Sequence, residues 1–256
     1  PKGWWAFWLF RRLKASFHTI IFPLFLLYLV YMLSIWLWNP NGGIIFPNPN
    51  APTGIPKTLV DIENLIKINQ DSVVVIDEAY VDFGTESVIK LVNKYKNLLV
   101  TQSFSKSRSL AGIRLGCAFG NKNLIEGLNR IKNSFNSYPI DRLAQTAGIE
   151  AIKDENHFNE TRDKIIKARA FLEKELLLMD FETLPSGANF IFTKHKLKDG
   201  AIIFNKLRES GVIVRHFERP ARIFQYLRIT IGTQEEMKKF ISILNGVLRE
   251  RILLSK

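Results

Sequence analysis

The sequence predicts an α/β protein with a layered, mostly parallel sheet, followed by a smaller α+β region. From residue 41 onward, short apolar and β-branched runs alternate with segments that have helical periodicity. The apolar runs end in polar or turn residues, which is typical of the buried strands of parallel sheets. The chain has 256 residues, of which 46% are hydrophobic, so it is long enough to form a substantial core.

Four strands are predicted in the first region, at residues 43–49, 72–80, 97–105 and 114–120. Two segments between them, 58–70 and 86–95, have apolar residues three and four positions apart and charged residues on the opposite face. This spacing predicts amphipathic helices. We therefore expect the four strands to be parallel and buried, with helices packed on the sheet.

Longer helices are predicted at residues 139–154 and 157–179, and the second could bridge two domains. Strand and helix patterns then alternate over residues 181–187, 189–194, 200–211, 212–217 and 226–232, before a closing helix from residue 233. We predict three parts: a hydrophobic segment (1–40), part of a large ligand-binding domain (41–155), and a bridging helix with a small domain (156–256).

The first forty residues differ from the rest of the chain. Residues 17–38 contain no Asp, Glu, Lys or Arg and follow the basic sequence "RRLK". Their length and apolarity meet the criterion for a membrane-spanning helix, which Pro23 would kink. A shifted reading frame or a deletion is the alternative origin, since the chain opens at Pro1 and all five Trp residues precede residue 39. We expect a cytoplasmic protein, anchored to a membrane only if 17–38 is a genuine span.

The net charge of +12 comes from Lys and Arg residues that are scattered among acidic ones. No basic face with interleaved aromatic residues is visible, so we expect phosphorylated or carboxylated small molecules as partners and no nucleic acid. The single cysteine, Cys117, permits neither an internal disulfide nor a cysteine metal cage. The four histidines lack the spacing of metal ligands, so no metal site is expected.

Polar residues follow three of the predicted strands, where open α/β sheets bind their ligands. These residues are "PNPNAPTG", "DEAY" and "SFSK". In the third motif Lys106 lies near Ser103, Ser105 and Arg114. Hydroxyls and a guanidinium suit a bound anion, while the lysine amine can condense with an aldehyde.

The second motif carries a carboxylate, Asp77, at the end of the apolar run "VVVI". A buried carboxylate needs a cationic partner, and a protonated pyridine nitrogen is one such partner. A helix cap is the alternative role for Asp77. Tyr80 is either a packing aromatic or a phenol that reaches an oxygen on the ring.

Six motifs occur in order: "PNPNAPTG", "VVVIDEAYVDF", "SFSKSRSLAGIRLG", "GANFIF", "GVIVRHF" and "YLRITIG". With these motifs, residues 41–256 resemble the fold-type I pyridoxal-phosphate aminotransferases, and within them the histidinol-phosphate aminotransferases. The resemblance implies a three-layer sandwich around a mostly parallel sheet, incomplete here, with a small α+β domain. It makes residues 41–155 part of the large cofactor-binding domain, and it implies a homodimer.

The resemblance also implies roles at the cofactor. Lys106 would bond to the aldehyde of pyridoxal phosphate and move the proton during the reaction. Asp77 would keep the pyridine nitrogen protonated, and Tyr80 would bind the phenolic oxygen of the ring. The residues implied for the cofactor phosphate are Ser103, Ser105 and Arg114, with Ser103 standing where many members have Thr.

On the substrate side, Arg228 matches the arginine that binds a carboxylate or phosphate. Arg215 resembles its helper, although a salt-bridged strand arginine is the alternative, and Asn189 falls at a family position near the substrate. Most members have an asparagine on the ring oxygen where this chain has Ala51. Either Asn50, one place earlier, reaches that oxygen or the contact is missing.

The implied reaction converts histidinol phosphate and 2-oxoglutarate into imidazole-acetol phosphate and glutamate. Aromatic aminotransferases and threonine-phosphate decarboxylases share most of the motifs and remain alternatives. The family's amino-terminal half supplies a glycine-rich phosphate turn, a stacked aromatic residue and a tyrosine for the neighbouring subunit, and residues 1–40 match none of these. We therefore expect weak or absent activity, with a non-catalytic, membrane-associated or truncated remnant as the alternative from a different class.

Overall fold

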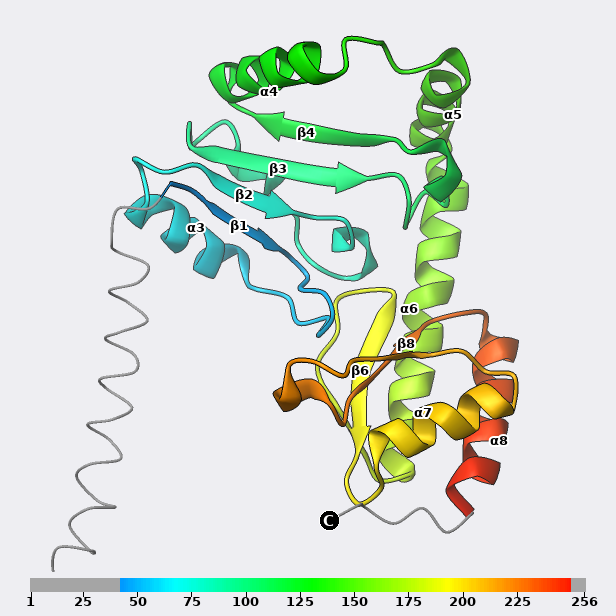
Figure 1. Cartoon of the computed structure of the whole chain (residues 1–256). Coiled ribbons are helices and arrows are strands. Elements are labelled where there is room, and N and C mark those ends of the chain that lie inside the picture. Colours follow the sequence, from blue (N-terminus) through cyan, green and yellow to red (C-terminus); the bar gives the residue numbers. More distant parts are fainter. Residues whose placement is uncertain (1–41, 250–256) are drawn as a thin grey trace, which may run out of the picture.

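The structure is a computed structural model that describes residues 42–249. It contains two four-stranded sheets and a long helix, α6 (Glu155–Leu178), that runs beside both of them (Figure 1). Residues 1–40, with the predicted span at 17–38, lie outside the described part. Between residues 42 and 249, no helix is both long enough and apolar enough to cross a membrane.

The first sheet has the order β1-β2-β3-β4. Its strands are β1 (Ile44–Pro47), β2 (Val74–Asp77), β3 (Leu98–Ser103) and β4 (Gly116–Gly120). The first three are parallel, as predicted, but β4 is antiparallel to β3, so the parallel prediction for residues 114–120 is wrong. The connection over residues 104–115 contains the 3₁₀ turn η4 (Ala111–Ile113) and no α-helix, so it turns back at one end of the sheet and does not form the crossover of a parallel pair.

One face of this sheet packs on α3 (Leu59–Ile68). Val74 and Ile76 on β2 face Ile62 and Ile66 of the helix, and alternate residues of β3 extend the same core. Thr58 caps α3 in a reciprocal capping box with Asp61, the third residue of the helix. The α/β class predicted from the alternating pattern is confirmed.

The predicted helix at residues 86–95 is wrong, because this segment forms only the short 3₁₀ turn η3 (Val88–Leu91). The Ser87 hydroxyl and the Val88 N–H both donate to the Glu78 carboxylate at 2.6 Å, which fixes the start of the segment against the end of β2. The backbone then closes on Leu91 and enters β3 at Leu98. These contacts leave one 3₁₀ turn, η3, in this segment in place of the predicted α-helix.

Two helices follow the first sheet: α4 (Lys122–Phe135), which lies outside the helices predicted from the sequence, and α5 (Arg142–Lys153), which falls within the helix predicted at residues 139–154. Helix α4 contacts the edge strand β4. Its apolar positions include Ile131 and Phe135, and both side chains are exposed. This helix therefore contributes no buried residue to the core of the described part of the chain.

The second sheet is antiparallel and has the order β5-β6-β8-β7. Its strands are β5 (Phe181–Thr183), β6 (Phe190–His195), β7 (Arg215–His216) and β8 (Leu227–Thr230). Helices α6, α7 (Gly200–Glu209) and α8 (Gln234–Arg249) pack with one face of it in a second core. The predicted domain limits after residues 40 and 155 stay predictions.

Helix α6 offers a direct test of this second core. Leu172 is fully buried, whereas Leu177 on the same helix is 66% exposed. We expect Leu172→Ala to lower the free energy of unfolding by about 2–5 kcal/mol, because it leaves a cavity. Leu177→Ala, the matched control, should change it by less than about 0.5 kcal/mol. Urea denaturation measures both, and equal losses would contradict the assigned core.

Candidate active site

Asp77 is the last residue of β2, with Pro47 of β1 and Thr101 of β3 as its neighbours across the sheet. Its carbonyl oxygen accepts from the Asn48 N–H at 2.8 Å, and its Oδ1 accepts from the Ala79 N–H at 3.0 Å. Asp77 Oδ2 has no hydrogen-bond or ion-pair partner among the described residues. Asp77 therefore presents a carboxylate oxygen to a cation at the carboxyl end of the sheet.

The next residue, Glu78, is a buried carboxylate with a structural role. It is 2% exposed and accepts hydrogen bonds from Ser87, from the Val88 N–H and from the Gln102 amide. Burial raises the pKa of Glu78, and its three hydrogen bonds oppose that shift. Adjacent carboxylates thus have opposite surroundings, because consecutive strand residues point to opposite faces.

Lys106 lies in the loop after β3 and is exposed. Its Nζ is 5.5 Å from the centroid of the Tyr80 ring. The Ser103 hydroxyl accepts from the Ser105 N–H at 3.0 Å, which closes the turn that precedes the lysine. The structure thus brings the predicted lysine and tyrosine together, above the ends of β2 and β3.

The residue after the lysine anchors this loop to the turn that follows β2. Ser107 is buried, and its hydroxyl donates to the Asp82 carboxylate at 2.5 Å. Asp82 belongs to the 3₁₀ turn η2 (Val81–Phe83), directly after Tyr80. This bond ties the loop that carries Lys106 to the turn that carries Tyr80.

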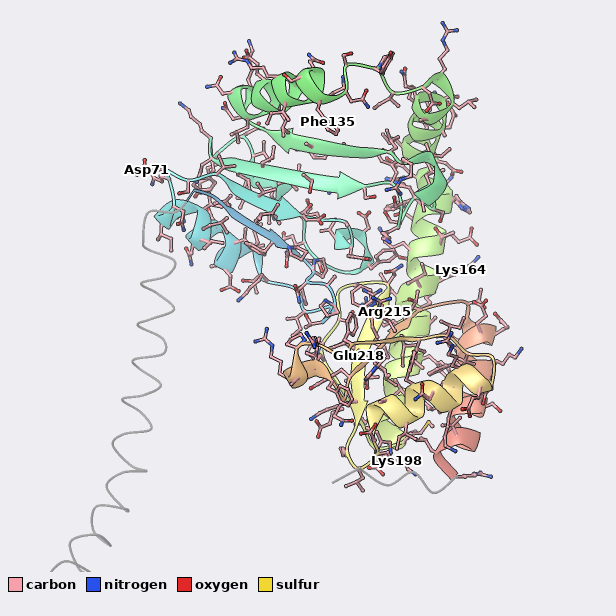
Figure 2. The ribbon with its side chains drawn as sticks, in the orientation of Figure 1. Asp71, Phe135, Lys164, Lys198, Arg215 and Glu218 are labelled. Carbon is pink, nitrogen blue, oxygen red and sulfur yellow. The ribbon has the colours of Figure 1, made fainter. Side chains whose placement is uncertain are left out.

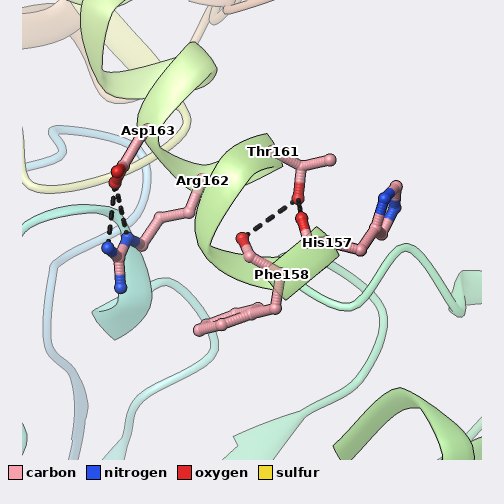
Figure 3. Close-up of polar contacts among 5 residues, drawn as sticks. All are labelled: His157, Phe158, Thr161, Arg162 and Asp163. Carbon is pink, nitrogen blue, oxygen red and sulfur yellow. Dashed lines mark hydrogen bonds and ion pairs between the residues drawn. The ribbon is translucent and has the colours of Figure 1, made fainter. Parts of the chain in front are cut away.

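Arg108 anchors the other side of the loop to α5 and α6. Its guanidinium donates to the Ala151 carbonyl at 2.6 Å and lies 3.6 Å from the centroid of the Phe158 ring. Figure 3 shows Phe158 in the first turns of α6, where the Thr161 hydroxyl donates to the carbonyls of His157 and Phe158. The loop is therefore fixed at both residues that follow Lys106.

Arg114 lies at the same end of the sheet. The bond from the Phe104 N–H to the Leu115 carbonyl, at 3.1 Å, closes the loop next to Ser103. Arg114 has a left-handed backbone (φ 59°), and its exposed guanidinium donates to the Ala111 carbonyl at 3.0 Å. Its remaining N–H groups are available to an anion near the serine turn.

The second sheet supplies two arginines. Arg228 on β8 is directly opposite Arg215 on β7, which Figure 2 shows near the junction of the two sheets. The guanidinium carbon of Arg228 lies 5.0 Å from the Phe190 ring centroid, and its buried Nε has no partner among residues 42–249. Phe190 in turn meets the Tyr80 ring edge to face at 5.1 Å. These contacts link the lysine side of the site to the arginine side.

The contacts of the two predicted asparagines, Asn50 and Asn189, place their segments at the site but show no side-chain contact with its other predicted residues. The Asn50 amide donates to Thr53 of its own turn at 2.7 Å, and the Gly54 carbonyl of that turn accepts from the Gly187 N–H at 2.9 Å. The Asn189 carbonyl accepts from the Ile231 N–H at 2.9 Å, at the start of β6. Both asparagines thus lie on segments that meet at the junction of the sheets. Whether Asn50 takes the role expected at Ala51 stays a prediction.

Three residues that shape this site were not among the predicted ones. Asp82 and Phe190 lie inside the motifs "VVVIDEAYVDF" and "GANFIF". The motifs include these residues but do not indicate their roles. Arg169 on α6 binds backbone carbonyls on both sides of the junction. Its signal in the sequence is a charged residue in the apolar stripe of Ile165 and Leu172.

The groups that converge here suit an organic ligand with a cationic ring nitrogen and anionic substituents. The site offers the Asp77 carboxylate, the Lys106 amine, and the guanidiniums of Arg114 and Arg228. In the described part of the chain, no group of three or more His, Cys, Asp or Glu side chains could hold a metal ion.

The sequence model of the family "Aminotransferase class I and II" matches residues 37–244. The histidinol-phosphate aminotransferase of Pseudomonas syringae pv. syringae (strain B728a) is 56% identical over 209 residues, which are 82% of this chain and 59% of that protein. The chain thus spans about six tenths of the length of the curated relatives it matches.

Solved structures share the fold. The histidinol-phosphate aminotransferase from Clostridium acetobutylicum has a TM-score of 0.75 at 24% identity, over 81% of this chain and 64% of that one. The enzyme from Sinorhizobium meliloti, in complex with pyridoxal-5'-phosphate, has a TM-score of 0.73 at 23% identity, over 81% of this chain and 57% of that one.

Glu78 predicts a pH-dependent stability. Its folded pKa lies above its ordinary value of 4.5, so the folded chain holds this proton more tightly than the unfolded chain. The contribution of Glu78 to the free energy of unfolding is fully present below pH 4.5 and is lost as the pH rises through the raised pKa. Urea denaturation across this range should show that Glu78→Gln, which cannot titrate, removes this part of the pH dependence.

The matched control for that experiment is Glu218→Gln, because Glu218 is exposed. This variant should keep the pH dependence of the unmodified chain. A Glu78→Gln profile parallel to that of the unmodified chain would contradict the assignment of the raised pKa to Glu78.

Proposed function

This chain belongs to the class I and II aminotransferases, and on that premise we propose that it binds pyridoxal phosphate and transfers the amino group of histidinol phosphate to 2-oxoglutarate, with the weakened activity expected from the sequence. The observation that carries the proposal is the Lys106 amine, which is exposed and lies 5.5 Å from the Tyr80 ring centroid. Its loop follows β3, the strand that pairs with Asp77 through Thr101. The choice of substrate rests on the names of the relatives.

The residues present fit this cofactor. When bound, pyridoxal phosphate supplies an aldehyde that condenses with amines and a ring that accepts the electron pair left by a departing proton. Asp77 Oδ2 would bind the ring N–H and keep that nitrogen protonated, and the Tyr80 hydroxyl would donate to the phenolic oxygen. The phosphate would lie on the groups at the end of β3, which are Ser103, Ser105 and Arg114.

Lys106 has two tasks in this proposal. Its amine would hold the cofactor through the aldehyde group until an amino substrate displaces it. The free Nζ would also be the base that takes a proton from the substrate carbon bearing the amino group and later gives it up. The hydrogen bonds of Ser107 and Arg108 fix the loop on the carboxyl side of Lys106 and would limit the positions that its amine can take.

Arg228 would bind the anionic end of each substrate in turn, first the phosphate of histidinol phosphate and then a carboxylate of 2-oxoglutarate. A guanidinium binds both anions in the same forked geometry. The buried Nε without a partner supports this role, since a buried donor is stabilised once an acceptor is bound. Arg215, directly opposite, would raise the local positive charge, and Asn189 would lie beside the substrate.

The remaining parts of the proposal concern the whole protein. Because the chain spans about six tenths of its relatives, the complete reaction, a homodimer and a cytoplasmic location are proposed rather than observed. Aromatic amino acids and threonine phosphate are the competing amino substrates. Spectra of the loaded chain, titrated with each of the three, would rank them.

Borohydride labelling tests the cofactor site. The chain is incubated with pyridoxal phosphate, reduced and digested, and the modified lysine is located by mass spectrometry. We expect one equivalent of label, on Lys106. Asp77 and the groups that bind the cofactor phosphate would hold the ring beside this amine and no other. Lys106→Arg should lose it, while Lys164→Arg, a change at an exposed helix position, should keep it. A label spread over surface lysines would refute the proposed function.

Arg228→Gln tests the anion site in the loaded chain. Loss of the charged hydrogen bonds should weaken the binding of 2-oxoglutarate by about tenfold or more, while the labelling of Lys106 persists. Arg222→Gln is the control, because Arg222 is exposed on a neighbouring turn. Titration calorimetry measures both, and equal affinities for the two variants would remove Arg228 from the site.

A further inference from the structure

Arg169 joins the two halves of the site through a single nitrogen. Its side chain is 11% exposed, and its Nη1 donates to the carbonyl of Phe83 at 2.9 Å and to that of Ala188 at 2.6 Å. Phe83 ends the turn that follows β2, and Ala188 lies two residues before the start of β6. The guanidinium therefore bridges the first sheet and the second.

Both carbonyls belong to segments that carry proposed site residues. Phe83 is three residues after Tyr80, and Ala188 is next to Asn189 and two residues before Phe190. The Tyr80 and Phe190 rings meet edge to face at 5.1 Å across the junction. The two hydrogen bonds of Arg169 thus fix the backbone beside each ring of that pair.

Arg169 has little other electrostatic support. Its nearest carboxylate, Glu173 on the same helix, lies 3.9 Å from Nε, at the long end of the ion-pair range. Burial lowers the pKa of the Arg169 guanidinium, so the charge is held at a cost that the carbonyl contacts offset. Gly84, the next residue after Phe83, has φ +124°, a backbone conformation that favours glycine, and lies against the Arg169 guanidinium.

We propose that Arg169 is a positioning residue of the active site: by binding both carbonyls, it holds Tyr80 on the cofactor side in register with Asn189 and Phe190 on the substrate side. The inference deepens the proposed function and rests on it. Arg169 contacts neither ligand and acts only through the two main-chain carbonyls.

Hydrogen exchange of the unliganded chain tests the bridge itself. In Arg169→Met the amide exchange of residues 83–85 and of residues 188–190 should rise together, by about tenfold or more, because both carbonyls lose a buried donor. Arg169→Lys keeps the positive charge but lacks the planar guanidinium, so its amides should exchange more slowly than those of Arg169→Met and faster than those of the unmodified chain. A rise confined to one segment, or no rise, would overturn the proposal.

Two controls separate positioning from general destabilisation. Glu173→Gln removes the distant ion-pair partner and should leave the exchange of both segments unchanged. Val247→Ala trims a buried side chain in α8, within the core of the second sheet. It should lower the melting temperature without selective exchange at the two segments, and a selective rise in this variant would overturn the proposal.

Ligand binding gives the readout that a purely structural role would not produce. The proposed cofactor contacts come from the first sheet, whereas 2-oxoglutarate needs both halves in register. In Arg169→Met we expect pyridoxal phosphate affinity to change by less than about threefold and 2-oxoglutarate affinity to fall by about tenfold or more. Proportional losses of both would overturn the positioning role. If the unmodified chain takes no label on Lys106, the proposed function fails, and the exchange experiment alone decides whether Arg169 bridges the halves.

Discussion

The parallel register of β1, β2 and β3 is the constraint on which the site depends. Asp77 is level with Pro47 and Thr101, so the three strands end at one edge of the sheet and their following loops meet there. Because β4 returns antiparallel from that edge, the loop with Lys106 is held close to the end of β3 instead of leaving in a crossover. A shift of one residue in β2 would turn Asp77 to the opposite face and place Glu78 in the site.

The contrast between Asp77 and Glu78 shows how the fold assigns different roles to identical chemistry. Glu78 is enclosed, and its hydrogen bonds hold the segment from Ser87 to Val88 and the Gln102 side chain against the strand ends. Asp77 keeps one oxygen without a protein partner. The enclosed carboxylate thus organises the back of the site, and its neighbour is left for a cationic ligand. The bonds from Ser107 and Arg108 then fix the lysine loop on this support.

The second sheet contributes a different environment, an arginine pair beside aromatic rings. Arg228 and Arg215 are cross-strand neighbours, and Phe190 lies between Arg228 and Tyr80. The apolar rings exclude water around the guanidinium, which strengthens its interaction with an anion. Helix α6 packs with this sheet through Leu172 and Leu176 and reaches the turn after β2 through Arg169. One helix therefore contacts both parts of the site, and the proposed alignment of cofactor and substrate groups depends on those contacts.

The sequence by itself determined the α/β class, most strands and helices, and the motifs that hold Asp77, Lys106 and Arg228, because periodicity and turn residues are local signals of burial and chain reversal. The tertiary structure alone decided the antiparallel direction of β4, the 3₁₀ turn in place of the helix at residues 86–95, and the bridge made by Arg169. Each of these depends on partners that local patterns do not encode: the short return from β3, the Glu78 carboxylate ten residues before Val88, and a carbonyl 86 residues from Arg169. Such contacts join residues far apart in the sequence, so they stabilise the fold only once the helices and strands have packed together.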